Sequence, residues 1–165
     1  RSDVSTDEYK NMIYLKTAYM IGLSSEIGGI ISKLDKNEIS LLKNFGDSIG
    51  MAYQVQDDLL ELFSDSSSMN KSLSSDFTLN KKTFLWTSTE NENREELNQL
   101  ISGFNENKDG TIKKIRNFII SHGIKEKAEF FISEKINYAN SLLDELDKDT
   151  DFLYHYSNLI FNRGN

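Results

Sequence analysis

The chain has 165 residues, a net charge of −7 and 38% hydrophobic residues, which suits one soluble domain with a filled core. The negative charge argues against nucleic acid as a partner, and the absence of cysteine excludes disulfides, thiolate catalysis and zinc–thiolate sites. Only His122 and His155 are histidines, and no apolar run approaches the roughly 20 residues of a membrane span. We therefore expect a soluble cytoplasmic protein with no transmembrane segment, although a first residue other than Met suggests truncation.

The absence of proline and the nine glycines predict long helices, and no stretch alternates as a strand does. A capping box at Ser5-Thr6-Asp7-Glu8 predicts a helix that runs toward Ile30 or Ser32. A second long helix is expected from about Glu38 to Phe63, followed by a polar loop from Ser64 to Ser75.

Helical patterns continue to the end of the chain. They predict helices over residues 76–88, up to about Gly103, and over 111–121, 125–146 and 152–161, with a break at His122-Gly123. The fold class expected for residues 1–165 is therefore a single all-α domain.

One stretch of the second long helix gathers an amide and three carboxylates. Gln54, Asp57, Asp58 and Glu61 recur every three or four residues, so a helix directs them toward one side. Such a cluster repels itself unless a divalent cation lies over it, and hard oxygen ligands with room for water suit Mg²⁺.

Lysines lie on both sides of this acidic stretch. They are found in Lys16-Thr17 upstream and in Lys71 and Lys81-Lys82-Thr83 downstream. Acids that hold magnesium, together with lysines that face the same cavity, match the needs of a diphosphate ligand. The pattern therefore predicts a magnesium–diphosphate site.

Several motifs in order resemble the C-terminal half of the trans-type polyprenyl diphosphate synthases. The segments that carry the resemblance are Lys16-Thr17-Ala18, Phe45-Gly46-x3-Gly50-x2-Tyr53-Gln54-x2-Asp57-Asp58, Lys71-x4-Asp76-x4-Lys81-x-Thr83, Ser121-x-Gly123 and Tyr138-Ala139. The resemblance implies an all-α bundle of the isoprenoid synthase type, of which this chain is the C-terminal part.

The resemblance also implies a reaction and roles for individual residues. The reaction is the magnesium-assisted condensation of isopentenyl diphosphate with an allylic prenyl diphosphate. The metal ion would be bound by Asp57, Asp58 and Glu61. The diphosphate would be held by Lys16, Lys71 and Lys81. The catalytic residues beside the allylic carbon would be Lys16, Thr17 and Gln54.

The chain departs from the family pattern at two residues and lacks one of the family's motifs. Glu61 stands where the family usually has a third aspartate, and Asn70 replaces the usual glycine before Lys71. In addition, no second Asp-Asp pair exists, so the family's first aspartate-rich motif is absent along with its N-terminal half. The isolated chain is therefore expected to be inactive, and to form a homodimer or pair with an N-terminal half.

Two other functions stay open at this point. One alternative is a non-catalytic helical subunit or fragment that supports a partner half. The other is a plain helical interaction domain whose motifs are accidental. Magnesium-dependent diphosphate binding distinguishes the prenyltransferase and the supporting subunit from the interaction domain.

Overall fold

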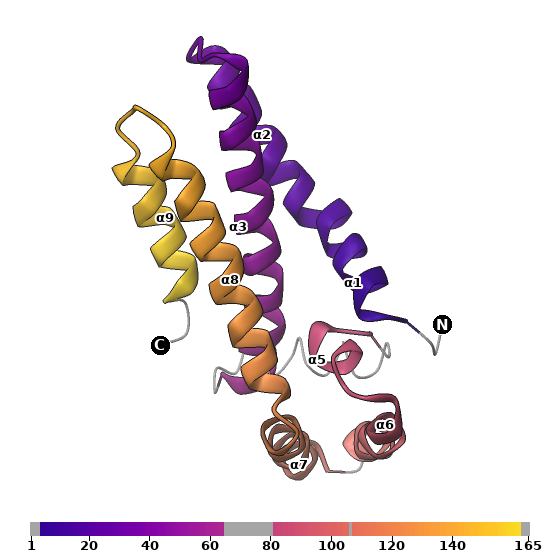
Figure 1. The fold of residues 1–165 in the computed structure, drawn as a ribbon. Coiled ribbons are helices and arrows are strands. Elements are labelled where there is room, and N and C mark those ends of the chain that lie inside the picture. The colour runs from indigo at the N-terminus through magenta and orange to yellow at the C-terminus, as the bar shows by residue number, and fades with distance from the viewer. Residues whose placement is uncertain (1–3, 65–80, 106, 163–165) are drawn as a thin grey trace. The chain divides into compact units, whose positions relative to one another are not determined.

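The computed structural model describes residues 4–64, 81–105 and 107–162, and every regular element within these ranges is a helix (Figure 1). The elements are α1 (Thr6–Ile13), η1 (Tyr14–Ala18), α2 (Tyr19–Ile31), α3 (Lys36–Phe63), α5 (Phe84–Thr87), η2 (Asn91–Asn93), α6 (Arg94–Ser102), η3 (Gly103–Asn105), α7 (Lys108–Ser121), α8 (Ile124–Asp144) and α9 (Asp151–Phe161). The prediction of an all-α fold is confirmed.

The residues form two compact units. The first unit comprises residues 1–9 and 57–129, and the second comprises residues 10–56 and 130–165. The prediction of a single domain stays a prediction.

None of the described helices is both long enough and apolar enough to cross a bilayer.

The predicted capping box begins the first helical stretch. Ser5 Oγ accepts a hydrogen bond from the Glu8 backbone N–H at 3.1 Å, and the Ser5 N–H donates to Glu8 Oε2 at 3.0 Å. The stretch ends at Ile31, as predicted, but it contains a π-helical turn, η1, that the sequence did not predict. In this turn the Tyr19 N–H donates to the carbonyl of Tyr14, five residues back.

A second cap, which the sequence analysis missed, begins α3. Asp35 Oδ1 accepts from the backbone N–H of Glu38 at 2.9 Å, and the Asp35 N–H donates to Glu38 Oε2 at 2.9 Å. This reciprocal pair is a capping box with aspartate as the first residue. The helix it begins ends at Phe63, as predicted.

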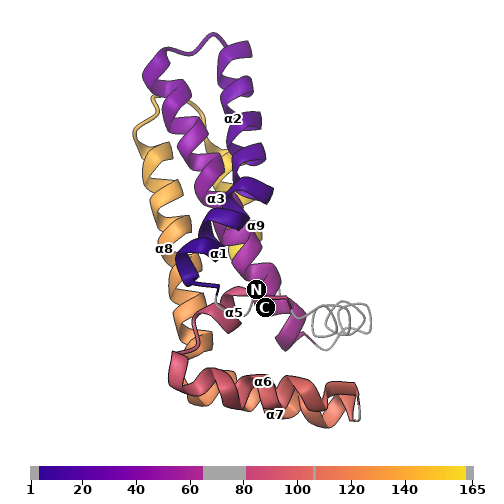
Figure 2. The same ribbon diagram turned by 90° about the vertical axis from the view of Figure 1, so that its right-hand side faces the viewer.

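In the second unit, α2 and α3 cross with their backbones in contact (Figure 1 and Figure 2). A Cβ atom at Gly50 would lie 2.4 Å from the Cα of Ala18, and one at Gly46 would lie 2.8 Å from the Cα of Gly22. No side chain fits at such distances, so glycine is required at the crossing. The same unit buries large aliphatic side chains along its helices, among them Ile13, Ile49, Val55, Ile136, Leu143 and Ile160.

The C-terminal helices of the second unit are joined by polar contacts. Ser157 Oγ on α9 donates to Asn140 Oδ1 on α8 at 2.8 Å, and the Tyr154 hydroxyl donates to the Asn140 carbonyl at 3.2 Å. Tyr154 also hydrogen-bonds Asp144. Both helices have the bounds that the sequence predicted, within two residues.

In the first unit, one carboxylate oxygen joins three segments. Asp58 Oδ2 on α3 accepts from the Tyr9 hydroxyl and from the Phe84 backbone N–H, each at 2.7 Å. Asp58 is 8% exposed, and Tyr9 is 2% exposed with its ring edge-on to that of Phe84. These bonds connect α1, α3 and the start of α5 within the unit.

The prediction of a helix over residues 76–88 is wrong for residues 81–83, which are not helical, whereas residues 76–80 lie outside the described residues. The helix begins only at Phe84 because Thr83 is its N-cap. The backbone of Thr83 is extended, and its Oγ1 accepts from the Trp86 N–H at 3.4 Å. The predicted break after α7 is confirmed, since His122 is the C-cap and Gly123 has a φ of +65°.

We expect Gly50→Ala to lower the free energy of unfolding by about 1–3 kcal/mol, because the added methyl group meets the backbone of Ala18. Ser40→Ala, on the exposed side of the same helix, should change it by less than about 0.5 kcal/mol. Urea unfolding followed by circular dichroism measures both. Equal effects would show that the crossing does not require glycine at position 50.

We expect Tyr9→Phe to lower the free energy of unfolding by about 1–3 kcal/mol, because Asp58 loses a buried donor. Burial and the adjacent Asp58 raise the pKa of Tyr9 above its ordinary value. An unfolded tyrosine ionises near pH 10, so the stability from Tyr9 is complete below about pH 10 and declines as the pH rises further.

The pH dependence of the stability from Tyr9 is tested by unfolding measured between neutral pH and about pH 11. This range extends past the ordinary tyrosine pKa of about 10. The decline in stability with rising pH should be shallower in Tyr9→Phe than in Tyr138→Phe, which alters an exposed ring on α8. Identical pH profiles for the two variants would contradict the assigned role of Tyr9.

Candidate functional site

The predicted acidic residues lie in the last two turns of α3, within the first unit. Asp57 and Glu61 are half-buried, and Asp58 is buried. Because Asp58 Oδ2 already accepts from Tyr9 and Phe84, this oxygen has a structural task. Asp57 is close enough to contribute to the raised pKa of Tyr9, after burial and the larger effect of Asp58.

Asp57 and Glu61 are four residues apart and are therefore neighbours on the helix surface. Among the described residues, no group of three or more His, Asp or Glu side chains is arranged to hold a metal ion. Mg²⁺ is commonly bound through one or two carboxylates together with substrate phosphates. A pair of carboxylates therefore fits a magnesium ion that arrives with a phosphorylated ligand.

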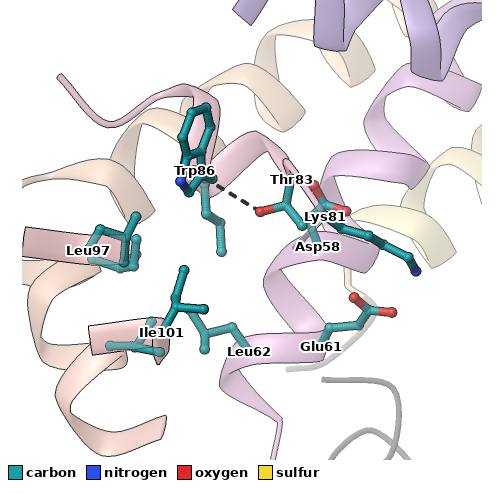
Figure 3. Close-up of a pocket in the computed structure, with 11 residues that line it drawn as sticks. Asp58, Glu61, Leu62, Lys81, Thr83, Trp86, Leu97 and Ile101 are labelled. Atoms are coloured by element: carbon teal, nitrogen blue, oxygen red, sulfur yellow. Dashed lines mark hydrogen bonds between the residues drawn. The ribbon is translucent and has the colours of Figure 1, made fainter. Parts of the chain in front are cut away.

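A cavity of the first unit brings three of the predicted site residues together. Asp58, Glu61 and Lys81 line it together with Thr83 (Figure 3). Figure 3 shows Glu61 and Lys81 extending to the same side of the cavity, away from Leu97 and Ile101.

The rest of the lining of this cavity is apolar. Its side chains are Leu62, Leu85, Trp86, Leu97, Ile101, Ile115 and Ile119, contributed by α3, α5, α6 and α7. Charged and apolar groups together give the cavity an amphipathic lining. Such a lining suits a ligand that joins a polar group to a hydrocarbon.

Two cations pack on the ring of Trp86. The Nζ of Lys82 lies 3.9 Å from the centroid of this ring, and the Cζ of Arg94 lies 4.6 Å from it. Burial, with a contribution from Arg94, lowers the pKa of Lys82. Lys82 therefore packs on an aromatic ring, whereas Lys81 is exposed.

Arg116 on α7 is a residue that the sequence analysis missed. Its Nε donates to the carbonyl of Leu62 at 2.6 Å, and its Nη2 donates to the carbonyl of Ser64 at 3.0 Å. These carbonyls are at the end of α3, where helical partners are lacking. Arg116 thus caps the helix that carries the acids, and no local sequence pattern indicates so distant a cap.

The other predicted catalytic residues belong to the second unit. Thr17 Oγ1 donates to Gln54 Oε1 at 3.1 Å, so the structure brings these two residues together. Thr17 and the exposed Lys16 both lie in the π-helical turn η1. Turns of this kind occur frequently at functional sites.

The remaining predicted residue, Lys71, lies outside the described residues. The assignments of Lys16, Lys71 and Lys81 to a diphosphate, and of Asp57, Asp58 and Glu61 to a metal, stay predictions.

Comparison with known proteins identifies the relatives of the chain. The short chain isoprenyl diphosphate synthase of Methanothermobacter thermautotrophicus is 29% identical over 149 residues, which are 90% of this chain and 46% of that protein. The geranylgeranyl diphosphate synthase of Sulfolobus acidocaldarius is 39% identical over 85 residues, which are 52% of this chain and 26% of that protein.

Solved structures show the same similarity. A geranylgeranyl pyrophosphate synthase matches with a TM-score of 0.86 and 28% identity, over 100% of this chain and 54% of that one. The geranylgeranyl pyrophosphate synthetase from Pyrococcus horikoshii matches with a TM-score of 0.81 and 26% identity, over 99% and 51% respectively. The prediction of an isoprenoid synthase type of fold is thereby confirmed, and the chain spans about half the length of these proteins.

The sequence profile of the Polyprenyl synthetase family matches residues 1–119. The match begins at the first residue and continues through the acidic stretch of α3, α5, α6 and most of α7. It therefore covers most of the chain, including each residue predicted to hold metal or diphosphate. The chain belongs to the Polyprenyl synthetase family.

Proposed function

We propose that the chain is the part of a prenyltransferase that carries the second aspartate-rich motif. The reaction joins isopentenyl diphosphate to an allylic prenyl diphosphate. Relatives with names such as isoprenyl and geranylgeranyl diphosphate synthase support this class of substrate. The observation that carries the proposal is the placement of Asp58, Glu61 and Lys81 around one cavity.

Asp57 and Glu61 would hold Mg²⁺ through their carboxylates, with Asp58 supporting the site from its buried position. When bound, Mg²⁺ supplies positive charge that stabilises the diphosphate as it leaves. Through its hydrogen bonds to Tyr9 and Phe84, Asp58 holds the end of α3 that carries Asp57 and Glu61. The two kinds of carboxylate thus have different tasks, one toward the ligand and the other toward the fold.

Lys16, Lys71 and Lys81 would bind the diphosphate. A lysine ammonium donates charge-assisted hydrogen bonds to phosphate oxygens. Lys81 is exposed beside the cavity, on the same side as Glu61 (Figure 3). A cation next to a carboxylate at this mouth suits a ligand that combines diphosphate with a metal ion.

Thr17 and Gln54 would place oxygen dipoles beside the allylic carbon, where positive charge develops. The Thr17 hydroxyl donates to Gln54 Oε1 and thereby holds the side-chain amide in one orientation. The Thr17 oxygen keeps its lone pairs for a developing cation.

The second candidate function is that of a non-catalytic chain that supports a partner half. The chain matches 46% of the length of the Methanothermobacter protein. Self-association into a homodimer, or pairing with an N-terminal half, belongs to this proposal, as does a cytoplasmic location.

Binding of a non-reactive allylic diphosphate analogue tests the site. In calorimetric titrations we expect affinity to require Mg²⁺ and to fall at least about tenfold in Asp57→Ala, because one of the two proposed carboxylate ligands is lost. Asp109→Ala removes an exposed carboxylate from the first turn of α7 and should leave affinity unchanged. Equal losses in the two variants would contradict the assignment of Asp57.

Product formation tests whether the chain needs an N-terminal half. We expect no prenyl product from the 165-residue chain alone, since it has no second Asp-Asp pair. Product should form when the N-terminal half of a polyprenyl synthetase is added, measured by incorporation of labelled isopentenyl diphosphate. Product from the chain alone would contradict the need for a partner half.

A further inference from the structure

The carboxyl end of α3 breaks the charge preference of a helix terminus. The last carbonyls of a helix lack partners within it and give this end a partial negative charge, which cations stabilise and anions destabilise. Yet Asp57, Asp58 and Glu61 all lie in the last two turns of α3, and its last turn contains no basic residue. The stabilising charge therefore has to come from another part of the chain.

Arg116 on α7 supplies this charge. Its Nε donates to the Leu62 carbonyl at 2.6 Å and its Nη2 donates to the Ser64 carbonyl at 3.0 Å, so one guanidinium contacts two carbonyls. Arg116 itself is half-buried. Ile115 and Ile119, on either side of it in the sequence, are buried and line the cavity described above. The packing of α7 therefore fixes where the guanidinium lies.

The two proposed metal ligands depend on this helix end. Asp57 and Glu61 are four residues apart, so they are neighbours only while the backbone between them is helical. Because α3 ends at Phe63, Glu61 belongs to its last turn, and helices fray from their ends. A cap just beyond Glu61 opposes fraying and keeps the two carboxylates at one spacing.

We propose that Arg116 is a positioning residue for the magnesium–diphosphate site, which holds the last turn of α3 helical and thereby keeps Glu61 beside Asp57. This inference rests on the proposed function and adds to it a residue outside the assigned acids and lysines. Arg116 acts through the backbone of α3 and does not touch the ligand. Removal of such an outer partner typically lowers metal affinity by about 10- to 100-fold.

Three variants form the test set. Arg116→Met keeps much of the side-chain length but removes the charge and the donors. Arg116→Lys keeps the charge, with a single ammonium in place of the planar fork that reaches two carbonyls. Lys113→Met removes a charge from an exposed position of the same helix and is the matched control.

Calorimetric titration with the non-reactive allylic diphosphate analogue, repeated over a series of Mg²⁺ concentrations, measures the effect on the site. Arg116→Met should raise the Mg²⁺ concentration for half-maximal binding at least about tenfold. Arg116→Lys should recover part of this loss, and Lys113→Met should behave as the natural chain does. An unchanged Mg²⁺ dependence in Arg116→Met, or an equal change in Lys113→Met, would overturn the proposal.

Amide hydrogen exchange without any ligand tests the positioning itself. The Ser64 N–H donates to the Leu60 carbonyl at the end of α3, and the Thr111 N–H donates to the Asn107 carbonyl at the start of α7, each at 2.9 Å. In the Arg116→Met chain, the Ser64 amide should exchange at least about tenfold faster because the helix end opens more often. The Thr111 amide should keep its rate.

Two results of the exchange measurement contradict the proposal. Unchanged exchange at Ser64 would show that Arg116 does not hold the helix end. Equal acceleration at Ser64 and Thr111 would show that α7 itself has loosened. If circular dichroism shows that Arg116→Met does not fold, Arg116→Lys takes its place in both measurements. It should show both changes to a smaller extent, and the absence of both would overturn the proposal.

Failure of this inference is distinguishable from failure of the proposed function. If the natural chain does not bind the analogue with Mg²⁺, the proposed function fails and the inference fails with it. If the natural chain binds the analogue and Arg116→Met binds it equally well at every Mg²⁺ concentration, only the role of Arg116 is lost.

Discussion

The first unit depends on how one buried carboxylate is satisfied. An ionised carboxylate removed from water is costly unless donors replace the lost hydration. Asp58 receives two such donors at one oxygen, a tyrosine hydroxyl from α1 and a backbone N–H at the start of α5. Because the donors come from segments far apart in the sequence, satisfying Asp58 also fixes where those segments lie. The segments that surround the acid-rich turn of α3, which are α1 and the start of α5, are therefore held there by Asp58.

The second unit has a different constraint, which is the distance between two helix backbones. Ala18 ends the π-helical turn and contacts Gly50, and Thr17 next to it reaches Gln54, one turn further along α3. The close crossing therefore sets the separation at which a short threonine side chain meets the glutamine amide. A wider crossing would leave both polar groups without this partner. The close crossing of the helices thus explains both the glycine at position 50 and the hydrogen bond between Thr17 and Gln54.

Sequence patterns predicted the helices well and the polar connections poorly. Helical periodicity, the Ser5–Glu8 cap and the glycine after His122 were sufficient for α1, α3, α7, α8 and α9. They failed at residues 81–83, where the capping preference of Thr83 prevailed over a helical pattern. The π-helical turn, the Arg116 cap and the contact of Lys82 with Trp86 arise from tertiary structure and have no local signal. The spacing of acids and lysines predicted a magnesium–diphosphate site, and the family resemblance assigned roles to the individual residues.

Arg116 makes the end of α3 depend on a much later part of the chain. Its guanidinium donates from α7 to the carbonyls of Leu62 and Ser64, which lie 54 and 52 residues earlier in the sequence. A segment that contained α3 without α7 would leave both carbonyls without these donors. The end of the helix that carries Asp57 and Glu61 is therefore capped only when α7 has packed against it.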